Sequence, residues 1–356
     1  MSREAETVAA PPPPDSAFGP TFRSIQYLRG IAAFAVVCFH AFQWTNAAGL
    51  TATDFPTGAA GVDVFFCISG FVMWVTTDRD PPKPLEFLRR RAVRILPPYW
   101  LFTLLAAVLA LTLPRVFQDV RFSTGNLVLS MLLIPHLDPI GDAFPLLKPG
   151  WTLCYEAAFY LIFAAGLLFA RRGRMIFLIL ALITMTVLGM LSKWASVLLC
   201  NPLMLEFLGG VLLAALWRTG KLGSVRRGGS LVVLAIACFV VLQTVDYRDY
   251  DWRPLFWGVP AAILVTGAVD AEAAHGLPNV LPLKWLGDAS FSIYLCHPLV
   301  IEALARLGPL DQAWVFIPEA AIASVAAGLI VRQLFEKPTL RWLNGVGRGM
   351  PGFAGR

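Results

Sequence analysis

An arginine and a histidine lie in one long apolar segment near the start of the chain. Arg29 and His40 are eleven residues apart in the segment YLRGIAAFAVVCFH, where most of the other side chains are apolar. At about 100° per residue, eleven steps along an α-helix bring two side chains to within roughly 20° of each other and about 16 Å apart along the axis. Ionisable side chains inside a membrane helix are costly and by default mark a functional site. The spacing therefore predicts a cation near the membrane rim and a deeper imidazole on the same helix face.

Two carboxylates are expected at a depth similar to that of the histidine. Asp63 lies in the segment GVDVFFCISG and Glu156 in the segment WTLCYE, each near the outer start of an apolar run. A carboxylate beside a histidine can fix its tautomer and stabilise the imidazolium, so His40 is a candidate general base with Asp63 or Glu156 as its partner. The alternatives are a histidine that is hydrogen-bonded inside the bundle and carboxylates that are favoured by helix dipoles.

An arginine-rich block precedes the third apolar run. Arg91 and Arg94 are three residues apart in FLRRRAVRILPPYW, so on a helix they face the same way. Guanidinium groups suit bidentate contacts with phosphate, and Arg29 is expected at the same cytoplasmic rim. Arg29, Arg91 and Arg94 are therefore candidates for binding a phosphorylated cofactor whose long arm extends toward His40. The alternative is an ordinary basic cluster that contacts anionic lipid headgroups.

A third polar group lies in the segment FSIYLCHP, residues 291–298. His297 is expected near mid-membrane, and Pro298 can kink the helix there because it removes a backbone hydrogen bond. We expect Tyr294, His297 and Trp151 to contact the substrate. The alternative is a set of polar contacts between helices. The six cysteines show no CxxC pair and no metal-ligand spacing, so no metal site is expected.

These side chains need a scaffold inside a membrane. Of the 356 residues, 57% are hydrophobic and only 15% are charged, whereas about a quarter of a soluble domain is charged. We therefore expect an all-α polytopic membrane protein with about ten transmembrane helices. A short apolar piece at 126–135 is too short to span. The expected spans are 24–44, 58–77, 95–113, 151–170, 175–192, 197–217, 229–245, 254–272, 286–306 and 313–333.

The basic residues orient this scaffold. With both termini in the cytoplasm, only seven of the 29 Lys and Arg residues fall in outer segments, namely Arg115, Arg121, Lys148, Lys193, Arg248, Arg253 and Arg306. The positive charge is thus a topology signal, and no nucleic-acid partner is expected. Residues 1–21 are expected to form a disordered cytoplasmic tail, residues 22–345 the membrane domain, and residues 346–356 a second cytoplasmic tail.

The spaced blocks resemble the acyltransferase-3 family over about residues 22–345. The resemblance rests on five elements in order, which are Arg29-X10-His40, GVDVFFCISGF, Arg91-X2-Arg94-Ile-X-Pro, WTLCYE and FSIYLCH. Members of this family are bacterial inner-membrane enzymes that transfer acyl groups, often acetyl, from acyl-coenzyme A to hydroxyls of surface or secreted carbohydrates. The resemblance implies a catalytic role for His40 and coenzyme A or acyl-relay roles for the three arginines. It also places Glu156 in the family's Trp-Ser/Thr-Leu-X2-Glu element.

The residues and the resemblance together predict an O-acyl transfer in the bacterial inner membrane, by a multi-pass protein in contact with lipid. Acyl-CoA, with acetyl-CoA as the expected donor, would dock on the cytoplasmic face, without any permanently bound cofactor. A carbohydrate or glycolipid acceptor would lose its hydroxyl proton to His40. A covalent acyl-His40 intermediate is the alternative chemistry. The alternative function is a proton-coupled small-solute transporter with His40, Asp63, Glu156 and His297 as its relay, although no clear inverted repeat is visible.

Overall fold

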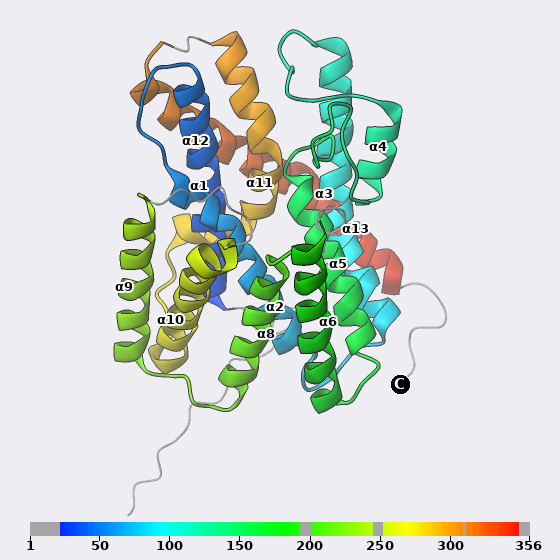
Figure 1. The fold of residues 1–356 in the computed structure, drawn as a ribbon, viewed down its shortest axis with the longest axis vertical. Helices are drawn as coiled ribbons and strands as arrows, with labels where there is room; N and C mark the ends of the chain where they lie inside the picture. Colours follow the sequence, from blue (N-terminus) through cyan, green and yellow to red (C-terminus); the bar gives the residue numbers. More distant parts are fainter. Residues whose placement is uncertain (1–21, 193–200, 245–251, 309–310, 349–356) are drawn as a thin grey trace, which may run out of the picture.

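The described part of the chain is a bundle of α-helices joined by turns and loops (Figure 1). The computed structural model describes residues 22–192, 201–244, 252–308 and 311–348, and no β-strand occurs within these ranges. The predicted all-α fold is therefore confirmed. The predicted N-terminal tail, residues 1–21, lies outside the described residues.

Long apolar helices make up most of the bundle. Within the described ranges, eight helical stretches are long and apolar enough to cross a membrane. Exposed apolar side chains such as Leu180, Val240 and Ile322 suit contact with lipid tails. The chain is thus a multi-pass membrane protein. The eight stretches contain α1 (Arg23–Ala47), α2 (Gly61–Thr77), α3 (Pro84–Thr112), α6 (Arg171–Leu191), α9 (Val225–Leu242), α10 (Val259–His275), α11 (Leu281–Leu307) and α12 (Ala313–Val331).

Two predicted spans correspond to shorter helices. α5 (Gly150–Gly166) has 17 residues and α8 (Met204–Arg218) has 15, whereas crossing a bilayer takes about 20. Each predicted span thus overlaps a helix, but α5 and α8 are short for a full crossing. The predicted span 197–217 begins outside the described residues, which resume at residue 201. The apolar piece at 126–135 forms the short helix α4 (Thr124–Met131).

Glycine residues on both partners let three helix pairs pack closely. A methyl group at Gly210, for example, would lie 1.9 Å from the carbonyl oxygen of Cys67. Small residues that allow backbones to approach each other are typical of helix contacts within bilayers. The facing residues are Gly30 and Gly287 between α1 and α11, Gly70 and Gly210 between α2 and α8, and Gly228 and Gly267 between α9 and α10. The first pair fixes the two helices that carry the histidines of the site.

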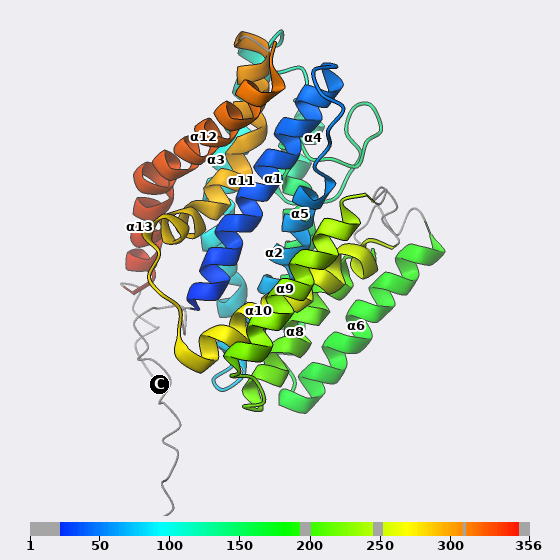
Figure 2. The ribbon, with the colours of Figure 1, turned by 90° about the vertical axis from the view of Figure 1, so that its left-hand side faces the viewer.

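The helices form two groups with α2 between them. In Figure 2, α1, α11 and α12 lie together, and α6, α8, α9 and α10 lie side by side in the other group. α2 packs on α1 from the first group and on α8 and α10 from the second. α3 and α5 complete the bundle because they pack on each other, with α3 also against α11 and α5 also against α2.

The segment between α3 and α5, residues 113–149, folds over one end of the bundle (Figure 1). It includes α4 and is tied to two helices. The Tyr99 hydroxyl of α3 donates a hydrogen bond to the Ser130 carbonyl oxygen at 3.0 Å. A carboxylate oxygen of Glu302 in α11 accepts a hydrogen bond from the Asp119 backbone N–H at 2.8 Å. The segment is thereby fixed as a wall above the bundle interior.

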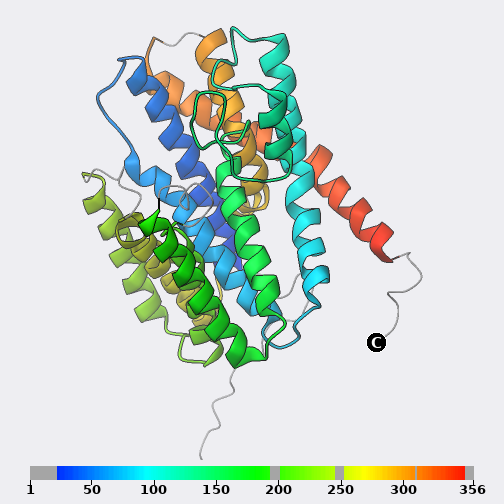
Figure 3. The same cartoon turned by 45° about the vertical axis from the view of Figure 1, so that its right-hand side comes forward.

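Short turns precede or interrupt several helices. A 3-10 turn, η1 (Pro56–Ala60), leads into α2, and a π-helical turn, η2 (Pro254–Gly258), leads into α10. A second π-helical turn, η3 (Arg332–Glu336), separates α12 from α13 (Lys337–Arg348). Figure 3 shows α13 pointing away from the bundle. α13 enters the segment 346–356, so the predicted C-terminal tail begins inside a helix.

Candidate active site

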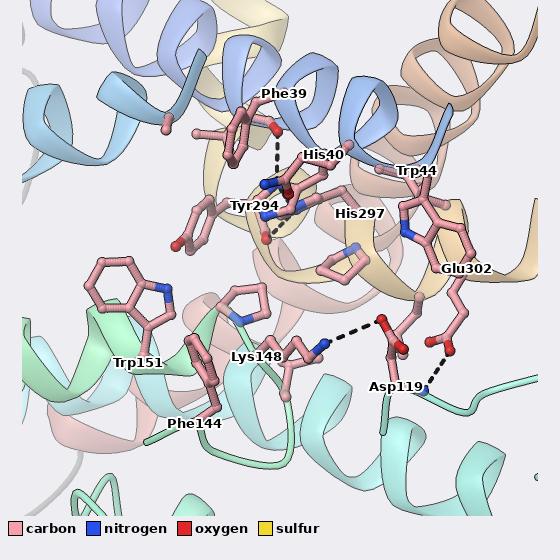
Figure 4. A pocket seen from close by; sticks show the side chains of 18 of the residues that line it. Phe39, His40, Trp44, Asp119, Phe144, Lys148, Trp151, Tyr294, His297 and Glu302 are labelled. Atoms are coloured by element: carbon pink, nitrogen blue, oxygen red, sulfur yellow. Dashed lines mark hydrogen bonds and ion pairs between the residues drawn. The ribbon is translucent and has the colours of Figure 1, made fainter. Parts of the chain in front are cut away.

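A cavity of about 900 Å³ lies beside His40 and His297, and we name it the outer cavity. Its walls come from α1, α11, the start of α5 and the segment 113–149 (Figure 4). Mixed apolar and polar linings of this kind are typical of sites for small organic ligands. Its aromatic and charged lining residues include Phe39, Trp44, Phe144, Trp151, Tyr294, Asp54, Asp119, Lys148, Arg253, Glu302 and Arg306. All three predicted substrate contacts, Trp151, Tyr294 and His297, thus lie in one cavity.

The two histidines contact each other at the wall of the outer cavity. His40 Nδ1 lies 3.3 Å from His297 Nε2, which brings α1 and α11 together at this point (Figure 4). His40 Nδ1 also lies 2.9 Å from the Val36 carbonyl oxygen, and His297 Nδ1 lies 2.7 Å from the Tyr294 carbonyl oxygen. Because a carbonyl oxygen can only accept a hydrogen bond, we assign the proton of each neutral ring to Nδ1.

This tautomer gives the histidine pair a defined chemistry. His40 Nε2 keeps its lone pair and is therefore the basic atom of the ring. His297 Nε2 accepts a hydrogen bond from His40 Nδ1–H, so it can stabilise the imidazolium that forms when His40 takes up a proton. His297 thus has the position that a carboxylate has in a Ser-His-Asp triad. The arrangement suits proton removal from a hydroxyl group in the outer cavity.

Polar contacts hold the rim of the outer cavity together. Lys148 Nζ lies 3.2 Å from Asp119 Oδ2, and the Asp119 backbone N–H donates to Glu302 as described above. The Arg306 guanidinium lies over the Trp44 ring, 5.4 Å from its centroid. These contacts join the segment 113–149 to α11, and α11 to α1, around the cavity (Figure 4).

A second cavity, of about 90 Å³, is lined by the predicted arginines, and we name it the inner cavity. Arg29 of α1 meets Arg91 and Arg94 of α3 there, together with Glu156 and Ser69. The Nε atoms of Arg29 and Arg91 are buried and make no hydrogen bond within the described part of the chain. Because buried donors without acceptors cost free energy, an anionic ligand at this end of the cavity would be stabilised by both groups.

Glu156 belongs to the inner cavity, and the structure does not bring it to His40. A carboxylate oxygen of Glu156 accepts hydrogen bonds from Ser69 Oγ at 3.0 Å and from the Tyr160 hydroxyl. Its charge acts on the nearby Arg29. The physical reason is the position of Glu156 along its helix. α5 begins directly after the segment 113–149, and Glu156 lies almost two turns further along α5, away from the outer cavity.

Asp63 contacts an arginine rather than His40. Arg253 Nε and Nη2 donate to the two carboxylate oxygens of Asp63 at 3.0 and 2.8 Å, and Nη2 also donates to the Ala59 carbonyl oxygen at 3.1 Å. Asp63 is fully buried, and Arg253 is 6% exposed. Asp63 lies in the first turn of α2, on the face toward η2, which directly follows Arg253. Asp63 therefore holds a cation in the wall of the outer cavity, which Arg253 lines.

The two cavities meet at Val62 of α2 and Tyr294 of α11, which line both of them. Arg29 lines the inner cavity and His40 the outer cavity, so they lie on opposite sides of these two residues. The sequence predicted one continuous path from the arginines to the imidazole. In the structure this region consists of two cavities, which share Val62 and Tyr294 as lining residues.

Sequence reasoning missed two charged residues of the site. It placed Arg253 in an outer loop and gave no role to Glu336, which accepts a hydrogen bond from Ser292 Oγ at 2.6 Å and whose charge acts on Arg29. One signal for Arg253 was present, because a buried carboxylate such as Asp63 requires a nearby cation. The sequence alone could not show which of the outer basic residues pairs with Asp63, because that depends on how η2 packs against α2.

Comparison with known proteins adds to this geometry. A model of a family described as an acyltransferase domain matches residues 22–332. The chain is 32% identical over 305 residues to the exopolysaccharide production protein ExoZ of Rhizobium meliloti. The aligned region covers 83% of this chain and 94% of that protein. It is 30% identical to the acyltransferase MdmB of Streptomyces mycarofaciens, over 90% of this chain and 92% of that protein.

A longer relative matches only in part. The peptidoglycan O-acetyltransferase OatA of Listeria monocytogenes is 26% identical over 87% of this chain. The match covers only about half (54%) of that protein. No solved structure gives a match to this chain. The family match covers most of the chain and includes every residue that lines the outer or the inner cavity. The chain therefore belongs to the acyltransferase-3 family and is a membrane-bound O-acyltransferase.

Proposed function

We propose that the protein transfers an acyl group, acetyl in the simplest case, from acyl-coenzyme A to a hydroxyl of a carbohydrate acceptor, with His40 as general base. The observation that carries this proposal is the hydrogen bonding of the histidine pair. His40 Nδ1 lies within hydrogen-bond distance of the Val36 oxygen and of His297 Nε2, which leaves Nε2 as the basic atom of a ring that lines the outer cavity. Membership in an acyltransferase family supports the same chemistry.

The reaction balances with these residues alone. The acceptor hydroxyl gives its proton to His40 Nε2 while its oxygen attacks the thioester carbonyl carbon. A C–O bond forms and the C–S bond breaks, so the acyl group leaves as an ester of the acceptor. The proton then passes from His40 to the departing thiolate, which leaves as coenzyme A. His297 stabilises the transient imidazolium by accepting its Nδ1–H, as the hydrogen-bond distance of 3.3 Å allows.

The donor is proposed to bind from the arginine side. Arg29, Arg91 and Arg94 line the inner cavity, and the buried Nε groups of Arg29 and Arg91 suit the phosphate oxygens of coenzyme A. The inner cavity is narrow, at about 90 Å³, so it suits the slender pantetheine arm rather than the nucleotide. The negative charge of Glu156 acts on Arg29 and Arg91 and so offsets the repulsion among the guanidinium groups.

The acceptor is proposed to bind in the outer cavity. The aromatic side chains of Trp44, Phe144 and Trp151 offer faces on which a sugar ring can stack, and charged residues around the rim offer hydrogen bonds to hydroxyls. Relatives named for exopolysaccharide production and peptidoglycan O-acetylation support a carbohydrate of the cell surface. We place the protein in the bacterial inner membrane, with the outer cavity on the side away from the cytoplasm. Family membership favours this enzyme over a proton-coupled solute carrier.

Replacement of His40 tests the proposal. In proteoliposomes with acetyl-CoA and surface glycans of the host, His40→Ala should abolish coenzyme A release, measured by thiol trapping, and ester formation on the glycan, measured by mass spectrometry. General-base catalysis contributes about 100- to 10,000-fold, so the rate should fall by at least about 100-fold. His136→Ala is the matched control, because His136 contacts Asn126 and lines neither cavity. Undiminished acetyl transfer by a correctly inserted His40→Ala protein would refute the assignment of the base.

The same preparation distinguishes direct transfer from a covalent acyl-His40 intermediate. Acetyl-CoA labelled in the acetyl group is mixed with the protein in the absence of an acceptor, and the protein is then analysed by mass spectrometry. Direct transfer predicts no labelled peptide that includes His40 and no burst of coenzyme A release. A labelled peptide that disappears in His40→Ala would replace the general-base step by nucleophilic catalysis.

A further inference from the structure

The narrowest part of the proposed path from donor to base is formed by two side chains. Val62 and Tyr294 line both cavities, whereas Arg29 lines only the inner one and His40 only the outer one. If the donor phosphates bind at the arginines, its thioester must come between Val62 and Tyr294 to reach a hydroxyl near His40. These two side chains therefore contact the acyl group at the moment of transfer.

The Tyr294 side of this constriction is held in place. Thr152 Oγ1 donates its proton to the Pro149 carbonyl oxygen at 2.9 Å, so in the 3.0 Å contact between the two hydroxyls Tyr294 is the donor and Thr152 the acceptor. The Tyr294 ring also packs edge-on against the Phe65 ring of α2, with 5.8 Å between the centroids. Tyr294 is 7% exposed, so its ring has little freedom to rotate away.

The Val62 side is held by the backbone of α2. Val62 is 6% exposed and directly precedes Asp63, whose ion pair with Arg253 fixes the first turn of this helix. Gly61, on its other side, packs against α1: a methyl group there would lie 2.4 Å from the Ala32 carbonyl oxygen. The turn that carries Val62 is thus fixed from two sides, and its branched side chain has a defined position opposite Tyr294.

From this geometry we propose that Val62 and Tyr294 set the longest acyl chain that the protein transfers. The inference rests on the proposed function, since it concerns the same donor. An acetyl group adds one methyl group beyond the carbonyl carbon, and each further methylene must fit between two side chains that their surroundings hold in place. A hydrophobic site discriminates by about 10- to 200-fold for one methylene. The residues thereby determine specificity without taking part in proton transfer.

The test compares acyl donors in variants of Val62. Rates with acetyl-, propionyl- and butyryl-CoA are measured for wild type, Val62→Ala and Val62→Ile. Val62→Ala should raise the butyryl-to-acetyl ratio of kcat/KM by about tenfold, the lower end of the usual range for one methylene. Val62→Ile should lower the propionyl-to-acetyl ratio. The matched control is Val64→Ala, because Val64 is a buried valine of the same helix that lines neither cavity.

The outcomes separate the inference from the proposed function. If wild type transfers acetyl groups and both Val62 variants keep the wild-type chain-length profile, the constriction has no role in selectivity and the inference is overturned while the proposed function stands. If wild type transfers no acyl group from acyl-CoA, the proposed function fails, and with it this account of the donor's path.

A physical measurement tests the constriction without relying on activity. Val72 lines only the inner cavity, so Val72→Cys places a thiol beyond the constriction. A membrane-impermeant thiol reagent is added from the outer side only, and the wild-type cysteines give the background rate. Labelling should be at least about tenfold faster in Val62→Ala/Val72→Cys than in Val64→Ala/Val72→Cys. Equal rates in the two proteins would show that Val62 does not close this passage and would overturn the inference even if the selectivity changed.

Discussion

The buried ion pair between Asp63 and Arg253 allows a quantitative prediction of how replacements change the free energy of unfolding. Asp63 is fully buried, and Arg253 donates to both of its carboxylate oxygens. The Glu206 carboxyl group lies close to Asp63 and is influenced by the charge of Arg253, without a hydrogen bond of normal geometry to a described residue. One guanidinium group therefore serves two carboxyl groups in the interior of the bundle.

The composition of this cluster predicts unequal costs for the two single replacements. Arg253→Met leaves two buried carboxyl groups without a cation, and loss of one partner from a buried pair costs about 3–5 kcal/mol of the free energy of unfolding. Asp63→Leu leaves Arg253 with Glu206 as a substitute partner, so its cost should be smaller, about 1–3 kcal/mol. The double variant should cost less than the sum of the two by at least about 2 kcal/mol, because it leaves only the Glu206 carboxyl group without a cation, whereas Arg253→Met leaves two carboxyl groups so.

Reversible unfolding in mixed detergent micelles, followed by circular dichroism, measures these free energies. The matched control is the exposed ion pair of Lys148 and Asp119, whose side chains are 45% and 46% exposed. Lys148→Met should change the free energy of unfolding by no more than about 1 kcal/mol. The reasoning is refuted if the Asp63 and Arg253 replacements are additive within about 0.5 kcal/mol, or if Asp63→Leu costs more than Arg253→Met.

Two further predictions concern the donor site and the helix packing. Arg91→Lys should raise the KM for acetyl-CoA by about 10- to 100-fold with little change in kcat, because a charge-assisted hydrogen bond contributes about 1.5–3 kcal/mol. In the same kinetic assay, replacement of the exposed Arg89 by alanine should leave both constants at the wild-type values. A fall in kcat alone would contradict a role of Arg91 in phosphate binding. Gly210→Ala should prevent close packing of α2 and α8 and sharply reduce the folded fraction on size-exclusion chromatography, because its methyl group would lie 1.9 Å from a backbone oxygen. Gly209→Ala has nothing within 4 Å of its added methyl group and should fold normally, so equal yields of the two variants would contradict the packing argument.

Much of the fold could be predicted from the sequence because long apolar runs have few alternatives in a bilayer. Each predicted span overlaps a helix of the structure, and the short piece at 126–135 became α4 as its length required. Helix periodicity predicted that Arg91 and Arg94 face the same way, and in the structure both line the inner cavity. The cost of polar groups in lipid placed His297 toward the bundle interior, where it contacts His40.

The partners within the site could not be predicted because they depend on the depth and rotation of each helix. Glu156 was expected beside His40, but the start of α5 is set by the packing of the segment 113–149, which moves Glu156 to the arginines. Asp63 shares its helix turn with Val62, and rotation of α2 decides which of the two faces the cavity. The sequence shows the period of a helix but not the angle at which its neighbours meet it.

The two imidazoles are paired without a hydrogen bond to any acidic side chain in the part of the chain that the structure describes, and this has a consequence for an enzyme embedded in lipid. Between turnovers both rings are electrically neutral in the tautomers that the Val36 and Tyr294 carbonyl oxygens select. In that state the histidine pair adds no charge to the interior of the bundle, and under the proposed mechanism it becomes charged only while His40 holds the acceptor's proton. An aspartate in place of His297 would add a permanent negative charge inside the membrane. A second, neutral histidine therefore costs less free energy in a protein surrounded by lipid.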